Sequence, residues 1–215
     1  MMKTNKPTVL ISGGRGQLAS YLAEIALGYG CKVVAFHRRT SNTDYTNIKH
    51  LLNHSDYILD YGDVTDLSSI IRLFREHGPI DYFFNAAANS FVASSWSDPV
   101  AVCETNFIGV VNCLEAIRIE SPKTKMLHSS TSEVVGGSTL EFQTEDEIQT
   151  PKSPYGVAKA AAEHMIKVYR DSYDFFVCFT RSFNFESKRR GEEFVTRKIT
   201  KSIGDMWKIL DKKSD

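Results

Sequence analysis

The stretch TVLISGGRGQLA, residues 8–19, decides the fold of this 215-residue chain. Its first five residues are apolar or small in succession, as expected for a short buried strand. The glycines that follow, at positions 13, 14 and 16, suit a tight turn, and residues 16–29 then carry the apolar spacing of a helix. A strand, a glycine-rich turn and a helix in this order begin a βαβ unit.

The rest of the chain repeats this alternation of short apolar runs and longer amphipathic runs. Most strand-like runs are continuous in apolar character, which is typical of parallel strands covered on both faces. We therefore expect an α/β fold, a Rossmann-type doubly wound parallel sheet with helices on both faces. The expected strands are residues 8–12, 32–37, 57–62, 81–88, 125–130 and 174–183, and the expected helices are residues 16–29, 66–76, 98–120 and 153–173.

Composition narrows the classes of function. Lys plus Arg and Asp plus Glu both number 26, so the zero net charge disfavours general affinity for nucleic acid or anionic membranes. The four cysteines form no CxxC pair, so we expect them to be reduced thiols. No apolar run approaches the roughly 20 residues that a membrane span needs. The N-terminus lacks the apolar core of a signal peptide, so we expect a cytoplasmic protein. His50 and His54 have i, i+4 spacing without a third ligand nearby, and we expect no metal site.

The glycine-rich turn is a candidate phosphate loop. Gly13 allows the tight turn, Gly16 lets backbone approach a pyrophosphate at the helix N-terminus, and Ala19 is small enough for close helix–strand packing. A tight turn that binds nothing is the alternative. The predicted contacts of this loop with a dinucleotide are Gly13, Gly14, Arg15, Gly16, Gln17 and Leu18.

Two arginines, Arg38 and Arg39, follow the second expected strand. An enzyme that uses NAD usually carries Asp or Glu here for the ribose 2′-hydroxyl, whereas arginines suit a 2′-phosphate through forked, charge-assisted hydrogen bonds. We therefore expect NADP as the cofactor, with a solvated basic turn as the alternative.

The ends of the third and fourth expected strands fit the same cofactor. Asp63 lies where a carboxylate can accept from the adenine amino group, and the small residues after Asn85 suit close passage of the dinucleotide. Alternatively, each segment could simply be the residues that end a strand. The predicted contacts in these two segments are Asp63, Val64, Ala86, Ala87, Ala88 and Ser90.

Tyr155 and Lys159 are four residues apart at the start of an expected helix and so share one face of it. An ammonium beside a tyrosine stabilises the phenolate, which makes the tyrosine a better base near neutral pH. The spacing Tyr-x-x-x-Lys is common by accident, but here it opens the helix after the fifth expected strand. That strand leads into SSTSE, residues 129–133, whose hydroxyls would lie at the carboxyl edge of the sheet, where open α/β folds bind ligands.

Four of these segments together resemble the extended short-chain dehydrogenases, which act mainly on nucleotide sugars: GGRGQLA, NAAA, SSTSEVVGG and SPYGVAK. A longer segment, SFNFESKRRGEEFVTRKITKSI at residues 182–203, is similar to the loop-and-helix signature of the GDP-mannose 4,6-dehydratases. HRRTSNT, YGDVTD and TSE fit that family too. The resemblance runs from Val9 to about Ile203, nearly the whole chain.

The resemblance implies dehydration of GDP-mannose to a 4-keto-6-deoxy sugar with catalytic NADP. Tyr155 would take the proton of the C4 hydroxyl, Glu133 would remove the C5 proton, and Thr131 would help water leave from C6. Lys159 would hold the ribose hydroxyls of the cofactor. An elimination needs an acid/base beyond tyrosine and lysine, which favours a catalytic Glu133, and a solvated loop acid is the alternative. The implied catalytic residues are Thr131, Glu133, Tyr155 and Lys159.

The same resemblance implies an NADP-binding Rossmann domain, residues 1–180, and a partial, shortened substrate-binding region, residues 181–215. Arg190 would reach the cofactor. The residues near the GDP-sugar would be Asn184, Glu186 and Lys198. A homodimer or homotetramer is also implied, because the Arg38–Arg39 segment could touch a neighbouring subunit.

Departures from the family pattern limit what the resemblance implies. Phe91 and Phe185 stand where histidines are usual, Lys188 replaces a proline, and family members continue well past residue 215. Two alternatives therefore stay open. One is a nucleotide-sugar 4-epimerase or reductase on the same scaffold, and the other is a truncated NADP-binding protein with little turnover.

Overall fold

The computed structural model describes residues 6–41 and 44–211. The chain divides into two compact units, Met1–Phe183 and Asn184–Asp215. Two residues of the HRRTSNT segment, Asn42 and Thr43, lie outside the described residues. The second unit contains one long helix among its described residues, α6 (Val195–Asp211).

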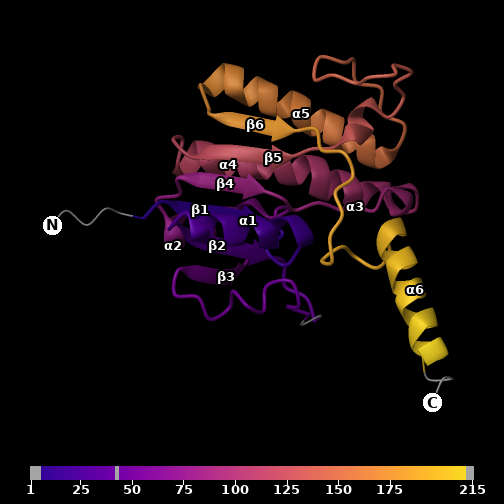
Figure 1. The fold of residues 1–215 in the computed structure, drawn as a ribbon. Coiled ribbons are helices and arrows are strands. Elements are labelled where there is room, and N and C mark those ends of the chain that lie inside the picture. The colour runs from indigo at the N-terminus through magenta and orange to yellow at the C-terminus, as the bar shows by residue number, and fades with distance from the viewer. Residues whose placement is uncertain (1–5, 42–43, 212–215) are drawn as a thin grey trace. The chain divides into compact units, whose positions relative to one another are not determined.

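The strands of the first unit form one parallel sheet (Figure 1). They are β1 (Thr8–Ser12), β2 (Lys32–His37), β3 (Tyr57–Tyr61), β4 (Tyr82–Asn85), β5 (Lys125–Ser129) and β6 (Val177–Thr180). Their order across the sheet is β3-β2-β1-β4-β5-β6, and every neighbouring pair is parallel. This doubly wound order reverses between β1 and β4 and confirms the predicted Rossmann-type fold.

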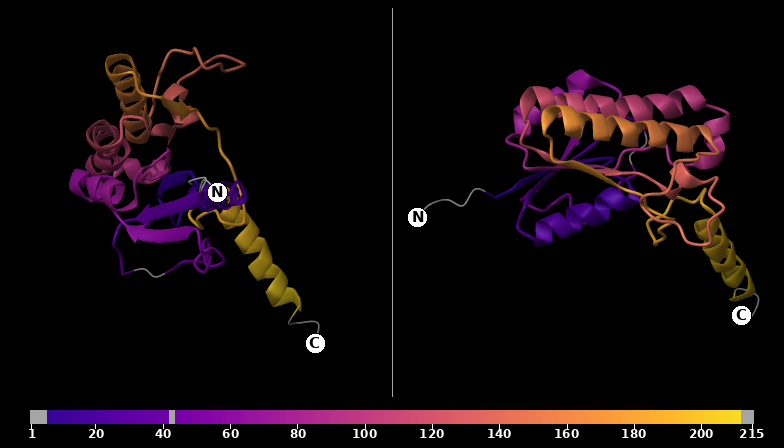
Figure 2. Two further views of the ribbon diagram at one scale, coloured as in Figure 1. Left: turned by 90° about the vertical axis from the view of Figure 1, so that its left-hand side faces the viewer. Right: turned by 90° about the horizontal axis from the view of Figure 1, so that it is seen from above.

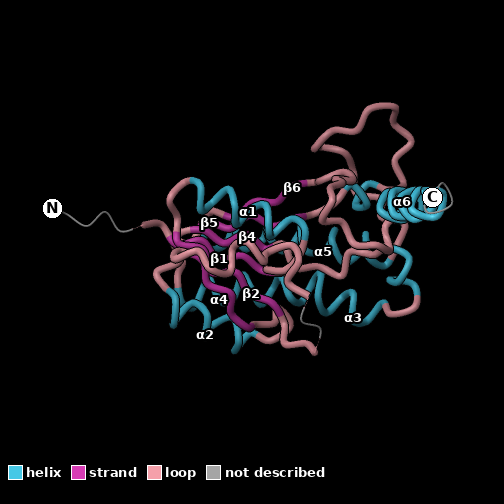
Figure 3. Tube along the Cα trace, turned by 60° about the horizontal axis from the view of Figure 1, so that its bottom comes forward, coloured by secondary structure: helices cyan, strands magenta, loops and turns pink. Residues whose placement is uncertain are grey.

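Helices cover both faces of the sheet (Figure 2). The helices of the first unit are α1 (Gln17–Gly28), α2 (Leu67–His77), α3 (Pro99–Cys103), α4 (Gly109–Glu120) and α5 (Pro154–Tyr173). Because successive side chains of a strand point to opposite faces of the sheet, β1 contributes side chains to two hydrophobic cores. Its Val9 and Ile11 pack with the alanines of α1, whereas Leu10 packs with α2, α4 and α5. Figure 3 shows the magenta strands side by side and the cyan helices that connect them.

Helix starts follow the signals predicted from the sequence. Asp66 caps α2, because its side chain accepts from the backbone N–H of Ser68 at 3.0 Å. Ser153 caps α5 in the same way, accepting from the N–H of Gly156 at 3.0 Å, and Pro154 occupies the first turn. These caps fix where α2 and α5 begin relative to the strand ends before them.

The single helix expected over residues 98–120 is interrupted. Between α3 and α4 lies η2 (Glu104–Ile108), one turn of π-helix. This turn contains the fully buried Asn106, whose side chain accepts from the backbone N–H of Asn89 at 2.8 Å and donates to the Asn89 carbonyl at 3.0 Å. The wider turn thus brings a polar amide to a loop backbone, a common use of π-bulges at functional sites.

Four strands are shorter than the sequence predicted, β3 and β5 by one residue each and β4 and β6 by more. β4 ends at Asn85, because residues 86–88 leave the ladder for the loop beyond the sheet edge. β6 covers only Val177–Thr180 of the expected 174–183. Asp174 instead closes α5 in the left-handed conformation with φ +54°, and Arg181 turns to pair with Glu163 at 2.9 Å.

One stretch, Pro99–Glu120, is long and apolar enough to cross a membrane by length and composition. Its side chains Cys113, Leu114 and Ile117 are fully buried in the core formed with the sheet. That burial accounts for its apolar character, and the successive helical segments α3, η2 and α4 that form the stretch belong to the core of the first unit.

Candidate active site

A cavity of about 330 Å³ lies at the carboxyl ends of β1, β2, β3 and β4. The sheet order reverses between β1 and β4, so the cavity opens at the switch point where open α/β sheets bind ligands. The predicted cofactor contacts that line it are Gly13, Arg15, Gly16, Arg38, Asp63, Val64, Ala87 and Ala88.

The glycine loop brings two strand ends close together. Gly13 has φ +67°, and a Cβ there would lie 3.2 Å from the backbone of Ala87. Gly14 donates its N–H to the carbonyl of Phe36 at 2.8 Å. Gly16 then begins α1 as its N-cap without a side-chain cap hydrogen bond, and the N-terminus of a helix is a favourable place for an anion. The loop therefore fits a pyrophosphate.

Other predicted cofactor contacts lie outside the lining of this cavity. Gln17 and Leu18 form the first turn of α1, and Ser90 is exposed. The guanidinium of Arg39 lies 4.6 Å from the ring centroid of Tyr61, so it stacks on an aromatic face. Contact of these residues with a cofactor stays a prediction, as it does for Gly14 and Ala86.

His37 lines the cavity although sequence reasoning did not select it. Its ring centroid lies 6.2 Å from that of Tyr45 and 5.2 Å from that of Tyr61. Its Nδ1 donates to the carbonyl of Arg38 at 2.9 Å, and burial lowers the pKa of His37, so the ring is neutral at pH 7. A neutral ring thus holds the backbone of Arg38 at the edge of the cavity. A histidine as the last residue of a buried strand is the signal that could have found it.

Asn106 is the second residue that sequence reasoning missed. It fixes the backbone of Asn89, which lines the cavity, and its signal is an amide inside an apolar helical run. The remaining lining residues that were not predicted are Phe36, Gly62, Thr65, Ala101, Glu104 and Thr105.

Tyr155 and Lys159 lie on the first two turns of α5 and are 7% and 1% exposed. Tyr155 packs with Val102 of α3. The Nζ of Lys159 donates to the carbonyl of Ser129 at 2.8 Å, which ties α5 to the end of β5. The predicted pair is thus held at the carboxyl edge of the sheet.

The charge state of this pair depends on its buried surroundings. Burial lowers the pKa of Lys159 to about 7, and the negative charge of Glu163 acts in the opposite direction. On β5, burial and then the charge of Lys159 lower the pKa of the fully buried His128 well below its ordinary value. The Nδ1 of His128 accepts from the amide of Asn85 at 3.2 Å. A titrating ammonium therefore lies near a neutral imidazole.

The turn η3 (Ser132–Val135) brings the other two predicted catalytic residues next to α5. The hydroxyl of Thr131 accepts from the backbone N–H of Glu133 at 3.2 Å and so caps this turn. A Cβ on Gly156 would lie 2.8 Å from the carbonyl oxygen of Glu133, so the turn contacts α5 directly beside Tyr155. Threonine, glutamate, tyrosine and lysine thus come from two adjoining segments.

The predicted sugar-binding residues belong to the second unit. Within it, the guanidinium of Arg190 lies 3.4 Å from the ring centroid of Phe194 and 3.6 Å from a carboxylate oxygen of Glu186. Glu186 also accepts from the hydroxyl of Thr196. Asn184 is exposed, and Lys198 is an exposed residue of α6. The contacts proposed for Asn184, Glu186, Arg190 and Lys198 stay predictions.

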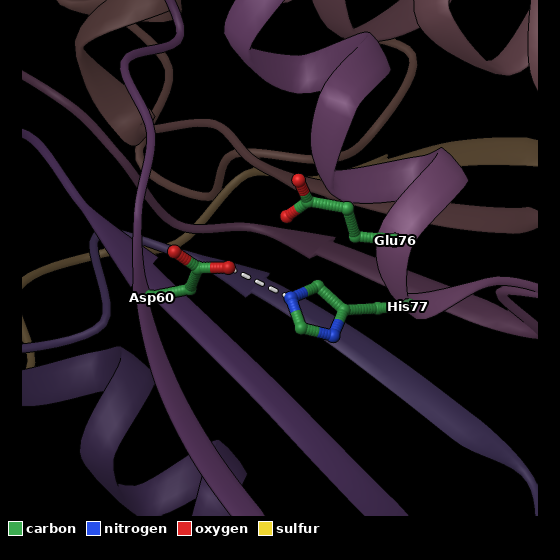
Figure 4. A group of neighbouring side chains, drawn as sticks. All are labelled: Asp60, Glu76 and His77. Carbon is green, nitrogen blue, oxygen red and sulfur yellow. Dashed lines mark hydrogen bonds and ion pairs between the residues drawn. The ribbon is translucent and has the colours of Figure 1, made fainter.

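Asp60, Glu76 and His77 form a compact cluster between β3 and α2 (Figure 4). The Nε2 of His77 donates to Asp60 at 2.7 Å, and Arg72 pairs with both Asp60 and Glu76. Burial raises the pKa of the Asp60 carboxyl, but hydrogen bonds from His77 and Arg72 outweigh it and lower that pKa. The carboxylates are already compensated by Arg72, so we assign this cluster as an ion-pair network.

Sequence comparison places the chain among known proteins. A family model described as GDP-mannose 4,6 dehydratase matches residues 10–213. The GDP-mannose 4,6-dehydratase of Vibrio cholerae is 38% identical over 214 residues, which cover 96% of this chain and 57% of the relative. That of Arabidopsis thaliana, GDP-mannose 4,6 dehydratase 2, is 39% identical over 204 residues, covering 91% and 54%. The chain spans little more than half the length of these curated relatives.

Solved structures share the fold. The dTDP-glucose 4,6-dehydratase of Bacillus anthracis, in complex with NAD, matches with a TM-score of 0.81 and 24% identity, covering 93% of this chain and 61% of that chain. The UDP-glucuronic acid 4-epimerase of Bacillus cereus, in complex with UDP-glucuronic acid and NAD, matches with a TM-score of 0.82 and 26% identity, covering 92% and 63%. Because the family match extends over almost its whole length, the chain belongs to the GDP-mannose 4,6-dehydratase family.

Proposed function

We propose that this chain forms the NADP-binding and catalytic part of a lyase that converts GDP-mannose to GDP-4-keto-6-deoxymannose in nucleotide-sugar metabolism. Family membership supports the reaction. The observation that carries the proposal is the grouping of Tyr155, Lys159 and the Thr131–Glu133 turn beside one strand end. The proposed reaction uses all four groups, because the oxidation at C4 would use the tyrosine and the lysine and the elimination would use the glutamate and the threonine.

NADP is the proposed cofactor. The NAD complexes of the structural neighbours support a nicotinamide dinucleotide in general, and Arg38 at the cavity after β2 supports the 2′-phosphate form. The glycine loop and the N-terminus of α1 would hold the pyrophosphate, and Asp63 would face the adenine. When bound, the nicotinamide supplies the acceptor and then the donor of the hydride.

The chain's own residues would move the protons. Tyr155 would take the proton of the sugar C4 hydroxyl, while the ammonium of Lys159 stabilises the phenolate and holds the ribose hydroxyls. A ketone at C4 acidifies the C5 hydrogen, and Glu133 would remove that proton. Thr131 would hydrogen-bond to the C6 hydroxyl, and the proton that Glu133 has taken from C5 would pass to this hydroxyl, so that it leaves as water.

The remaining parts of the proposal concern the second unit and the assembly. Arg190 would contact the cofactor, and the GDP-sugar would contact Asn184, Glu186 and Lys198. The division into an NADP-binding domain and a partial substrate-binding region remains a prediction from sequence. A homodimer or homotetramer and a cytoplasmic location remain predictions of the same kind.

Incubation of the chain with GDP-mannose and NADP, followed by mass spectrometry, tests the reaction. Loss of one water from the nucleotide sugar, with a 4-ketone, supports the dehydratase. An epimerised hexose of unchanged mass would favour a 4-epimerase instead. Because the chain spans about half the length of its relatives, a third outcome is thermal stabilisation by NADP without product, which would favour a cofactor-binding protein with little turnover.

A further inference from the structure

Glu163 is a fully buried carboxylate on α5, one turn beyond Lys159, with no part in the proposed chemistry. Its Oε1 accepts from the hydroxyl of Ser130 at 2.6 Å. Its Oε2 accepts from the amide of Gln149 at 2.6 Å and from the guanidinium of Arg181 at 2.9 Å. A buried carboxylate is costly unless such partners surround it, and here three side chains do.

The three donors come from three segments that frame the proposed catalytic turn. Ser130 directly precedes that turn, and Gln149 lies in the connection between η3 and α5. Arg181 follows β6, and its Nη1 also donates to the carbonyl of Glu145 in the same connection at 2.8 Å. One carboxylate therefore joins α5 to the end of β5, to the end of β6 and to residues 145–149.

Backbone hydrogen bonds continue this frame. The N–H groups of Ser130 and Ser132 donate to the carbonyls of Thr180 and Ser182, each at 2.9 Å, which extends the pairing of β5 with β6 beyond the strands. Arg181 lies between these two acceptors. The elements on both sides of the turn are thus the ones that Glu163 ties together.

Glu163 also supplies negative charge near Lys159. Burial lowers the pKa of Lys159, and Glu163 raises it. The other titratable groups around Lys159 are the neutral His128 on β5 and Tyr155 one turn back on α5. Removal of the Glu163 charge would therefore make the ammonium of Lys159 lose its proton at lower pH.

We propose that Glu163 is a positioning residue, which fixes the Thr131–Glu133 turn relative to Tyr155 and Lys159. The inference rests on the proposed function of those residues. Well-packed apolar side chains stabilise a core at least as well as a buried ion pair does. A buried carboxylate with three donors at this place is explained by a need for one fixed geometry between two proton-transfer groups.

Hydrogen–deuterium exchange of the 215-residue chain tests the positioning without turnover. Glu163→Gln keeps the side-chain size but turns one acceptor oxygen into a donor amide. Exchange should rise about 10-fold, both at the amides of residues 130–132 and over residues 137–150. Gln149→Ala removes one donor and should raise exchange over residues 137–150 only. Glu115→Gln changes an ion pair with Arg118 and a hydrogen bond from Tyr169, away from both segments, and is the matched control that should change neither of them.

Equal exchange over residues 130–150 in the parent and in Glu163→Gln overturns the proposal. If Glu163→Gln does not fold, the Gln149→Ala variant tests the proposal instead. Unchanged exchange over residues 137–150 in that variant would show that the bond to Glu163 does not hold this segment in place.

Steady-state kinetics separate positioning from a loss of folded protein. Glu163→Gln should lower kcat about 100-fold with KM nearly unchanged, and it should move the alkaline limb of the kcat profile to lower pH. If Glu163 served only the stability of the fold, kcat would fall only in proportion to the fraction of chains that still bind NADP, and the pH profile would not move. That result would overturn the proposal. A parent chain that forms no product contradicts the proposed function alone, and the exchange experiment still decides the positioning.

Discussion

The side-chain amino group of Lys159 donates a 2.8 Å hydrogen bond to the backbone carbonyl of Ser129. This bond places a fully buried ammonium at the junction of α5 and β5, where burial lowers its pKa from 10.5 to about 7. The lysine that the proposed chemistry needs is therefore also a titrating group of the core, and its protonation links stability to pH.

Lys159→Met should remove a pH-dependent term from stability. The unfolded lysine keeps its proton up to pH 10.5, whereas the folded one loses it near pH 7, so the unfolded state binds more protons between these values. Stability from this group therefore rises with pH, by about 1.4 kcal/mol per pH unit, across that window. Between pH 7 and pH 9, the melting temperature of the parent should rise relative to that of Lys159→Met. If the melting temperatures of the two proteins changed equally between pH 7 and pH 9, the lysine would not be desolvated in the folded state.

Glu133→Gln should abolish elimination and spare cofactor binding. The amide cannot accept the C5 proton, but it preserves the size of the side chain and the backbone contact of residue 133 with Gly156. A general base contributes about 10²–10⁴-fold to a rate, so dehydration should fall by at least two orders of magnitude. NADP affinity from a fluorescence titration serves as the control. Dehydration at the parental rate would assign the C5 base to another residue.

Arg38→Ala should weaken NADP much more than NAD. A hydrogen bond to a charged group is worth about 1.5–3 kcal/mol, which corresponds to a loss of roughly 10- to 100-fold in NADP affinity. The matched control is Arg75→Ala, which removes an arginine that pairs with Glu120 on the surface, and both affinities should then be unchanged. Calorimetric titrations with both dinucleotides measure the difference. Tighter binding of NAD than NADP by the parent would refute the cofactor assignment.

Features read from local chemistry were predictable from sequence. The turn at Gly13 needs only a strand, a glycine with positive φ and a helix in succession, and all three are visible within twelve residues. The pair Tyr155 and Lys159 is set by helical periodicity and by the Ser153 cap. Such features depend on neighbours in the chain, so their geometry follows from the order of residues.

Other features depend on contacts between distant segments. Glu163 meets Ser130, Gln149 and Arg181 only after three loops converge, and nothing in the spacing of these residues along the chain indicates that they meet. His37 likewise gains its role from the rings of two tyrosines that follow it in the chain. Tertiary packing decides these contacts, and for that reason the sequence pattern did not reveal them.

Gly156→Ala should test whether close contact between η3 and α5 matters. A Cβ at this position would lie 2.8 Å from the Glu133 carbonyl oxygen and 3.1 Å from the Cβ of Pro151, so the turn must shift. Overpacking of this kind costs about 1–3 kcal/mol, or roughly 3–9 °C in Tm for a chain of this size, and it should also lower dehydration by moving Glu133. The matched control is Gly28→Ala at the end of α1, where a Cβ meets open space, and Tm should be unchanged or rise slightly. Full activity in Gly156→Ala despite a lower Tm would contradict the proposed role of this contact. It would show that the position of Glu133 next to Tyr155 does not limit turnover.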